Sequence, residues 1–187
     1  MKLNIVPART GLVWVKLGIA TFFRQPLAFA GLFFIYMAVI SVATIVPFIG
    51  SALALALLPA ATLGLMAATL EASRGKFPMP TILISAFRAG RQQAGAMLTL
   101  GGMYAAGFLA IMGISTLLDG GKFARLYLLG GKISQELVSA PDFQSAMWVS
   151  TALYVPLSML FWRAPALLHR HGVPPGQSLV LSLVACL

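Results

Sequence analysis

Acidic, imidazole and thiol side chains, which carry most acid–base and metal chemistry, are few and widely spaced in this sequence. The chain of 187 residues has seven of them: Glu71, Asp119, Glu136, Asp142, His169, His171 and Cys186. General acid–base catalysis needs positioned groups within hydrogen-bond reach of one substrate. The carboxylates fall in two connections separated by an uncharged run, Gln92–Leu118. The sequence therefore predicts no catalytic residue.

The two histidines form a His-x-His pair, a spacing that can hold a metal ion. No Cys, Asp or Glu lies near His169 and His171 in the sequence, and Arg163 and Arg170 flank them. We predict an interfacial basic cluster there and no metal site. Neither histidine lies inside an apolar run, where a membrane-embedded haem would need it. Gly120-Gly121-Lys122 lacks the spacing of a phosphate-binding loop, so no cofactor is predicted.

Long uncharged segments dominate the chain. Gln25 to Leu70 is a run of 46 residues without a charge, and 59% of all residues are hydrophobic against 9% charged. About 20 apolar residues in a helix cross the ~30 Å hydrocarbon core of a bilayer. This run alone is therefore long enough for two crossings. The sequence predicts an all-α polytopic integral membrane protein.

The predicted architecture is a single membrane domain over residues 1–187, built from helical hairpins that each follow an interfacial amphipathic helix. Pro26 separates the first amphipathic segment from the next helix, because proline breaks or begins a helix. The predicted interfacial helices are 8–24, 80–92 and, as the start of a third unit, 177–187. The predicted spanning hairpins are 27–46 with 52–72, and 93–118 with 143–162. A short helix is also expected around Lys132–Ser139.

Basic residues gather in alternate connections, which predicts the orientation of the chain. The N-terminal segment carries four bases and no acid, the 71–91 connection carries four against Glu71, and the 119–142 loop carries three of each sign. Under the positive-inside rule this places the N-terminus in the cytoplasm. Topology accounts for the net charge of +9, so no nucleic-acid partner is predicted. The predicted lipid-headgroup contacts are Arg9, Lys16, Arg24, Arg88 and Arg91.

An internal repeat is suggested by matches at an offset of 97 residues. They pair Pro59 with Pro156, Gly75 with Gly172, Pro78 with Pro175 and Ser85 with Ser182. A repeat of this kind makes 177–187 the third interfacial helix, cut short. We therefore expect a natural protein with six crossings, continuing beyond Leu187.

Small residues recur at every fourth position of two predicted helices, and such stripes let helix backbones approach closely. The predicted helix-packing residues are Ala60, Gly64 and Ala68 on one helix and Gly102, Ala106 and Ala110 on the other. Contact with a partner subunit and packing within the bundle would both use these stripes. Packing within the bundle is the favoured interpretation.

The polar layout resembles an uncharacterised family of bacterial inner-membrane proteins, mostly proteobacterial. The resemblance rests on Pro-Ala-Arg-Thr-Gly at 7–11, on Ala-Pro-Ala-Leu-Leu-His at 164–169 and on the repeated hairpins. More loosely, the hairpin repeat is similar to other six-helix bacterial membrane families, including the membrane domain attached to some glycerophosphodiester phosphodiesterases. The resemblance implies six helices and a chain that ends early, and it implies no activity.

These features favour a non-catalytic accessory or scaffold subunit of a larger membrane complex, respiratory or photosynthetic, that packs against partner helices and lipid. The alternative is a small-molecule or lipid transporter with a path near Pro59 and Pro156, where prolines free backbone carbonyls. No charged residue lies deep within a predicted span, which argues against ion coupling. An interfacial enzyme using His169 or His171 ranks last.

Overall fold

The computed structural model describes residues 7, 9–45, 49–88 and 90–186, and it describes the side chains of all of these except 49, 86 and 88. Within these ranges every regular element is a helix, which confirms the all-α prediction. Four helices are long and apolar enough to cross a membrane. They are α2 (Pro26–Thr44), α3 (Ile49–Ser73), α5 (Arg91–Asp119) and α8 (Pro141–Trp162).

Shorter helices lie before, between and after the long ones. They are α1 (Arg9–Arg24), η1 (Pro80–Ile84, a 3-10 helix), α4 (Ser85–Arg88), α6 (Lys122–Leu129), α7 (Gln135–Ser139), α9 (Ala164–His171) and α10 (Pro175–Val184). Positions 8, 46–48, 89 and 187 of the predicted segments lie outside the described residues. The polar connections thus hold more helix than the sequence pattern predicts, namely α6 and α9.

The segment predicted as one amphipathic helix, 80–92, is divided in the structure. It begins as η1 and continues as the single α-helical turn α4, which ends at Arg88, and Gly90 has a φ of 110° that is incompatible with a helix. Only glycine adopts such a φ without strain. A new helix, α5, starts at Arg91. The division turns the chain from the surface of α3 into the next long helix.

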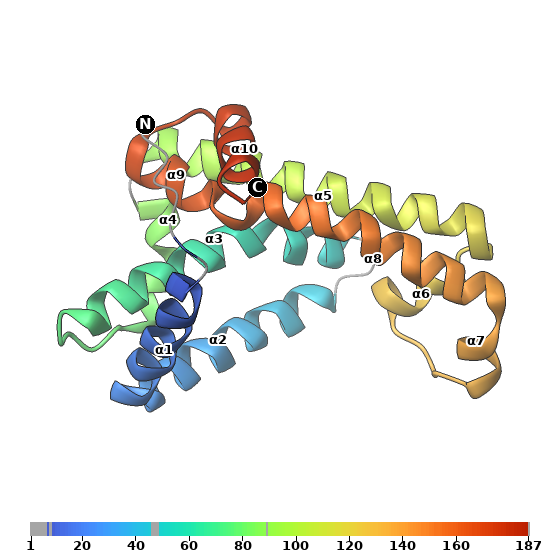
Figure 1. Ribbon diagram of the computed structural model, residues 1–187, viewed down its shortest axis with the longest axis horizontal. Coiled ribbons are helices and arrows are strands. Elements are labelled where there is room, and N and C mark those ends of the chain that lie inside the picture. Colours follow the sequence, from blue (N-terminus) through green and yellow to red (C-terminus); the bar gives the residue numbers. More distant parts are fainter. Residues whose placement is uncertain (1–6, 8, 46–48, 89, 187) are drawn as a thin grey trace.

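Three long helices and the two last short ones make the core. Figure 1 shows α5 and α8 side by side along their length, with α3 packed against α5 and α9 and α10 closing one end. The main buried cluster joins all five: Ala60, Leu63, Met97, Leu100, Tyr104, Phe161, Ala164, Leu168 and Leu179. A second cluster, around Phe108 and Ile111, packs α6 against α5.

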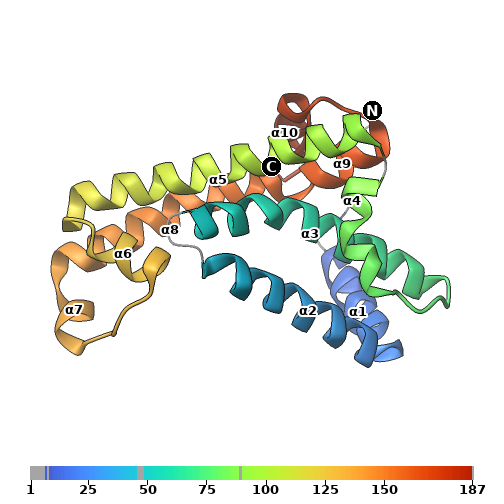
Figure 2. The same ribbon diagram turned by 180° about the vertical axis from the view of Figure 1, so that it is seen from behind.

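The helix α2 diverges from this core, as both ribbon views show (Figure 2). Only Ala28 and Leu32 of α2 are buried, and Leu32 meets Ala68 of α3 and Ile82 of η1. None of the described side chains of α1 is buried. The structure therefore consists of a packed core and a loosely attached N-terminal pair, α1 and α2.

Of the pairs that lie 97 residues apart, the two glycines occupy corresponding places in the fold, whereas Pro59 is buried and Pro156 is exposed. Gly75 and Gly172 both follow a helix and both have positive φ, 76° and 61°. After the first glycine the chain returns as η1 and packs on α3, and after the second it returns as α10 and packs on α8. The two serines differ in their partners. Ser182 Oγ donates to Met159 O (2.8 Å) and accepts from Arg163 N (3.0 Å), whereas Ser85 Oγ is buried without a partner among the described residues.

Candidate functional site

Two adjacent cavities meet at His169, at what we call the basic end of the molecule. This end carries the cations of the connections around α3, α5 and α9, namely Arg74, Lys76, Arg91, Arg163 and Arg170. The first, the polar cavity, has a volume of about 590 Å³. The second, the apolar groove, has a volume of about 770 Å³. Both fall in the size range of ligand sites in proteins.

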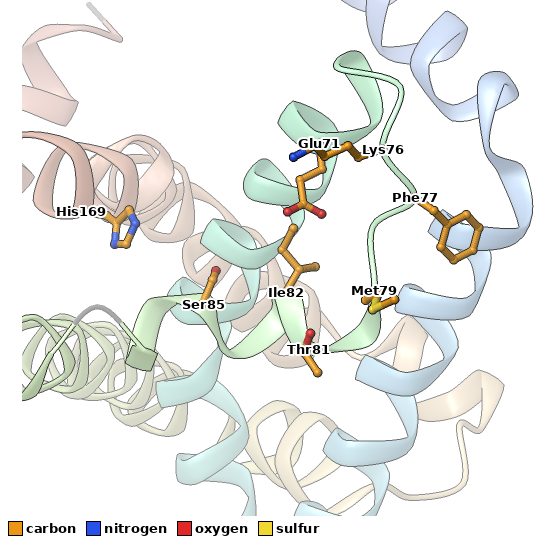
Figure 3. Close-up of a pocket in the computed structure, with 8 residues that line it drawn as sticks. All are labelled: Glu71, Lys76, Phe77, Met79, Thr81, Ile82, Ser85 and His169. Atoms are coloured by element: carbon orange, nitrogen blue, oxygen red, sulfur yellow. The ribbon is translucent and has the colours of Figure 1, made fainter.

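The polar cavity forms where the chain leaves α3 and returns as η1. Lys76 N donates to Glu71 O (3.0 Å), and Gly75 supplies the positive φ that this tight reversal requires. The reversal holds the backbone of Lys76 close to that of Glu71. The cavity is lined by Glu71, Lys76, Phe77, Met79, Thr81, Ile82, Ser85 and His169 (Figure 3).

Gly64 brings η1 close enough to complete the cavity. A Cβ at this position would lie 2.7 Å from the Cα of Leu83 and 3.2 Å from the carbonyl oxygen of Ile82. Only a residue without a side chain lets the η1 backbone lie directly on α3. This contact fixes the start of α4, and with it the position of Ser85.

His169 reaches the cavity from the opposite wall, on α9. Leu168 and Ala164 of the same helix are buried in the main core, with 2% and 0% of their surface exposed. Gln93 Nε2 also donates to His169 O at 3.2 Å, which ties α9 to the first turn of α5. The backbone of His169 is therefore held in place by contacts that are independent of any ligand.

Two polar atoms in the lining have no hydrogen-bond partner within the described part of the chain. They are Ser85 Oγ and His169 Nδ1, and both are buried. Leaving a buried polar group unpaired costs about 1–3 kcal/mol. Ser150 Oγ and Gln25 Oε1, which do not line this cavity, are also buried without a partner among the described residues, whereas Thr62 Oγ1 on α3 donates to Leu58 O of its own helix at 2.9 Å. The two unpaired atoms mark the polar cavity as a place for a hydrogen-bonding ligand or water.

The apolar groove runs along α3 beside the polar cavity. Its α3 lining extends from Leu63 to Ser73, eleven residues that span roughly 15 Å of helix. That length is about half of the ~30 Å hydrocarbon core. The other walls come from Leu17, Gly18 and Thr21 of α1 and from Ala166, His169 and Arg170 of α9. The groove thus has the depth of one membrane leaflet, an apolar floor and a cationic rim.

Two further cavities lie toward the end that carries α6. One, of about 200 Å³, lies between α5, α6 and α8 and includes Ser150 and Tyr154. The other, of about 500 Å³, lies between α5, α6 and the start of α3. Neither Pro59 nor Pro156 lines any of these four cavities, and Pro156 is exposed on the outside of α8.

The sequence is substantially similar to a named protein. It is 41% identical over 189 aligned residues to a probable inner membrane protein of Burkholderia thailandensis, and the alignment covers all of this chain and 70% of that protein. The chain therefore belongs to the same family of inner membrane proteins as this relative. Its predicted location in a bacterial inner membrane is thereby confirmed. No protein-family model matches the sequence, and no solved structure matches it.

The two predicted small-residue stripes lie in different surroundings. Ala60, Gly64 and Ala68 of α3 are all buried within the molecule. The stripe on α5 instead lies on its outer face: Gly102, Ala106 and Ala110 are exposed. The residue of α5 that approaches another backbone is the neighbouring Gly101, where a Cβ would collide with the carbonyl of Ala56 on α3.

The predicted headgroup residues Arg9, Lys16, Arg24 and Arg91 are exposed, and the side chain of Arg88 lies outside the described residues. Among the described residues, no group of three His, Cys, Asp or Glu side chains is placed to hold a metal ion. Sequence reasoning missed Glu71, Lys76 and Ser85 as neighbours of His169. The signal that could have found the first two is the Gly75 reversal, because it folds the connection back toward the end of α3.

Proposed function

We propose that this membrane protein binds a phospholipid molecule at its basic end and performs no catalysis on it. The observation that carries the proposal is the shared wall at His169, which joins a polar cavity to an apolar groove one leaflet deep. A phospholipid has the same two parts, a hydrogen-bonding headgroup and acyl chains about one leaflet long. The groove would take a chain and the polar cavity the headgroup.

The charge at the rim supports the same ligand. Lys76 lines the polar cavity and Arg170 lines the apolar groove, so a phosphate at their junction would have a cation on either side. A basic residue near an anionic lipid surface contributes about 1 kcal/mol of attraction. The absence of catalysis is supported by the lack of a hydrogen bond between a serine and a histidine in the described part of this site, which a nucleophilic serine would need. Ser85 Oγ and His169 Nδ1 have no partner among the described residues, so no serine–histidine pair is formed.

The proposal places the basic end, with the N-terminus, on the cytoplasmic side. Its support is the positive-inside rule, since Arg24, Arg74 and Arg91 all flank the long helices near that end. Reporter fusions after Arg24 and within the segment 130–134 should therefore show opposite sides of the membrane. Reporters on the same side would overturn the orientation.

Filling the apolar groove tests lipid binding. Gly18 lines the groove and has no atom within 4 Å of a Cβ built on it, so Gly18→Trp would add a large side chain there without a clash. We expect native mass spectrometry of the detergent-purified protein to show one retained phospholipid, and Gly18→Trp to lose it. Gly11→Trp is the matched control, because Gly11 lies on the same helix, is equally unobstructed and does not line the groove. Equal lipid retention by wild type and both variants would overturn the proposal.

A second candidate function is favoured by the outward stripe on α5. Gly102, Ala106 and Ala110 are exposed, and a Cβ on Gly102 meets nothing within 4 Å. Such a surface lets a helix of another subunit approach closely. We propose that this face packs against a partner in a larger membrane complex, as an accessory subunit would. Ala106→Trp should reduce recovery of that complex in a pull-down, whereas the exposed Ala152→Trp on α8 should not. If the wild-type protein purified in mild detergent migrates without any bound partner, this candidate function is excluded.

A further inference from the structure

We infer that the lipid held at the basic end has a zwitterionic headgroup, a phosphate joined to a primary ammonium, as in phosphatidylethanolamine. This inference rests on the proposed lipid binding and goes beyond it, because it names the headgroup. It starts from the distribution of acids. Glu71 is the only carboxylate among the first 118 residues, and it lines the polar cavity. The remaining acids, Asp119, Glu136 and Asp142, belong to the loop at the other end.

A carboxylate in this position disfavours a purely anionic headgroup. The basic end has many exposed cations, such as Arg74 and Arg91, where an anionic lipid can find a counter-charge without approaching an acid. In the polar cavity, a second negative charge near Glu71 would be repelled by the carboxylate. A ligand that carries a cation as well as a phosphate turns this repulsion into attraction.

The lining offers separate partners for the two charges. Glu71 can accept hydrogen bonds from an ammonium group, as charged acceptors do strongly. A phosphate could accept from the Ser85 hydroxyl, the His169 imidazole and the Lys76 ammonium, all of which can donate. Lys76 is drawn next to Glu71, and Ser85 and His169 lie further along the cavity (Figure 3). Figure 3 shows the Glu71 carboxylate and the Ser85 hydroxyl directed toward the same space, with the His169 ring beyond Ser85. The two atoms left unpaired in the structure, Ser85 Oγ and His169 Nδ1, would then each have a partner.

The primary ammonium is distinguished from a quaternary one by its hydrogens. A trimethylammonium headgroup carries the same charge but cannot donate to Glu71, and its methyl groups would keep the charge away from the carboxylate. We therefore expect the site to rank phosphatidylethanolamine above phosphatidylcholine and phosphatidylglycerol of identical acyl chains. One charge-assisted hydrogen bond corresponds to a preference of about tenfold or more.

The experiment is a lipid competition read by native mass spectrometry. The purified full chain is mixed with equal amounts of the three phospholipids with identical acyl chains, and the occupancy of each is measured. Wild type should favour the ethanolamine lipid about tenfold. Glu71→Gln should bring ethanolamine and glycerol lipids to within about twofold of each other, and Lys76→Gln should lower the occupancy of both. Glu136→Gln, an exposed acid on α7 at the opposite end, is the matched control and should keep the wild-type ranking.

The outcomes separate the two proposals. Absence of any retained phospholipid would overturn the proposed function itself. Retention with equal or higher occupancy by the glycerol or choline lipid would overturn the headgroup inference and leave lipid binding standing. The ranking among the three lipids is measured on wild type, so it decides the inference even if Glu71→Gln does not fold. Displacement by equimolar soluble glycerophosphoethanolamine would show that the ligand is the free headgroup, and this too would overturn the lipid inference.

Discussion

The helices α2 and α5 differ in burial, and the more apolar of the two is the less buried. The most apolar window of α2 has a mean hydropathy of 2.2 and is 11% buried, whereas that of α5 has 1.7 and is 44% buried. In water the more apolar helix would be expected to occupy the core. In lipid the acyl chains are as apolar as leucine, so hydropathy drives insertion and does not drive packing between helices. The comparison shows that shape selects the core of this protein.

The shape in question is visible on α5. Two glycines of α5 let neighbouring helices approach closely: Gly101 lies against the backbone of α3, and Gly107 lies against Leu157 of α8. The rings of Tyr104 and Phe161 also pack edge to face between α5 and α8. The helix α2 instead presents its large side chains outward, as Phe33 and Phe34 do with 52% and 68% of their surface exposed. Four sets of substitutions test this difference between the packed helix and the loose one.

The largest effect is expected at Gly101. A side chain there meets the backbone of α3 at Ala56, which cannot rotate away, so Gly101→Leu must push the helices apart. We expect a loss of about 3 kcal/mol in the free energy of unfolding, typical of severe overpacking. The measurement is an unfolding titration in mixed micelles. Gly102→Leu, one residue away and unobstructed, is the control and should change stability by less than about 0.5 kcal/mol. Equal losses of unfolding free energy for the two variants would mean that the close contact between α3 and α5 does not stabilise the core.

Deleting buried volume should also separate the two helices. Leu100 of α5 is fully buried, whereas Leu27 of α2 has 84% of its surface exposed. Leu100→Ala should cost about 2 kcal/mol, near the low end for buried leucines, because the transfer contribution is small when the surroundings are lipid. Leu27→Ala should be close to neutral in the same titration. A comparable cost at Leu27 would indicate that α2 is packed against something in the purified protein.

Asp119, the last residue of α5, begins the connection between α5 and α8. Its buried carboxylate accepts from Gly121 N (2.8 Å) and Phe123 N (2.6 Å), which caps α6 and folds it back onto α5. Asp119→Ala should destabilise the protein by about 1–2 kcal/mol, similar to the loss of an N-cap, because the first N–H groups of α6 lose their acceptor. Faster backbone hydrogen exchange is expected in 122–129. Asp119→Asn keeps one acceptor oxygen and should recover part of the loss. Unchanged exchange in α6 for the alanine variant would contradict the capping role.

The smallest effect is expected for the tyrosine pair between α5 and α8. Tyr104 and Tyr154 place their hydroxyl oxygens 3.3 Å apart. A double-mutant cycle with Tyr104→Phe and Tyr154→Phe should give a coupling of about 0.6 kcal/mol, the average for hydrogen bonds between membrane helices. Tyr36→Phe on α2 serves as the control and should show no coupling to Tyr154→Phe. A coupling well above 1.5 kcal/mol would show that a polar contact, and not shape alone, joins these helices.

Much of the element layout followed from the sequence. The long apolar runs predicted the helices α2, α3, α5 and α8 to within a few residues, because the length of an uncharged run is a local property. The 80–92 segment was not predicted in its divided form, because the break depends on the φ of Gly90. The helices α6 and α9 were missed because both lie in polar connections, where the uncharged runs give no signal. The helix α6 is capped locally by Asp119, a signal that the sequence does contain, whereas α9 depends on the burial of Leu168 in the main core, which is a contact between distant parts of the chain.

The candidate site was predictable only in parts. The sequence placed His169 in a basic connection and small residues at Ala60 and Gly64, but it could not say that Gly64 lets η1 lie on α3 and so brings Ser85 near His169. The sequence by itself determined that this chain is a membrane protein, because membrane insertion depends on the free energy of transferring each apolar segment into hydrocarbon. The tertiary structure alone decided which apolar faces form the core and where the cavities lie. Among helices that all prefer lipid, that choice depends on the close fit of side chains and backbones from distant parts of the chain.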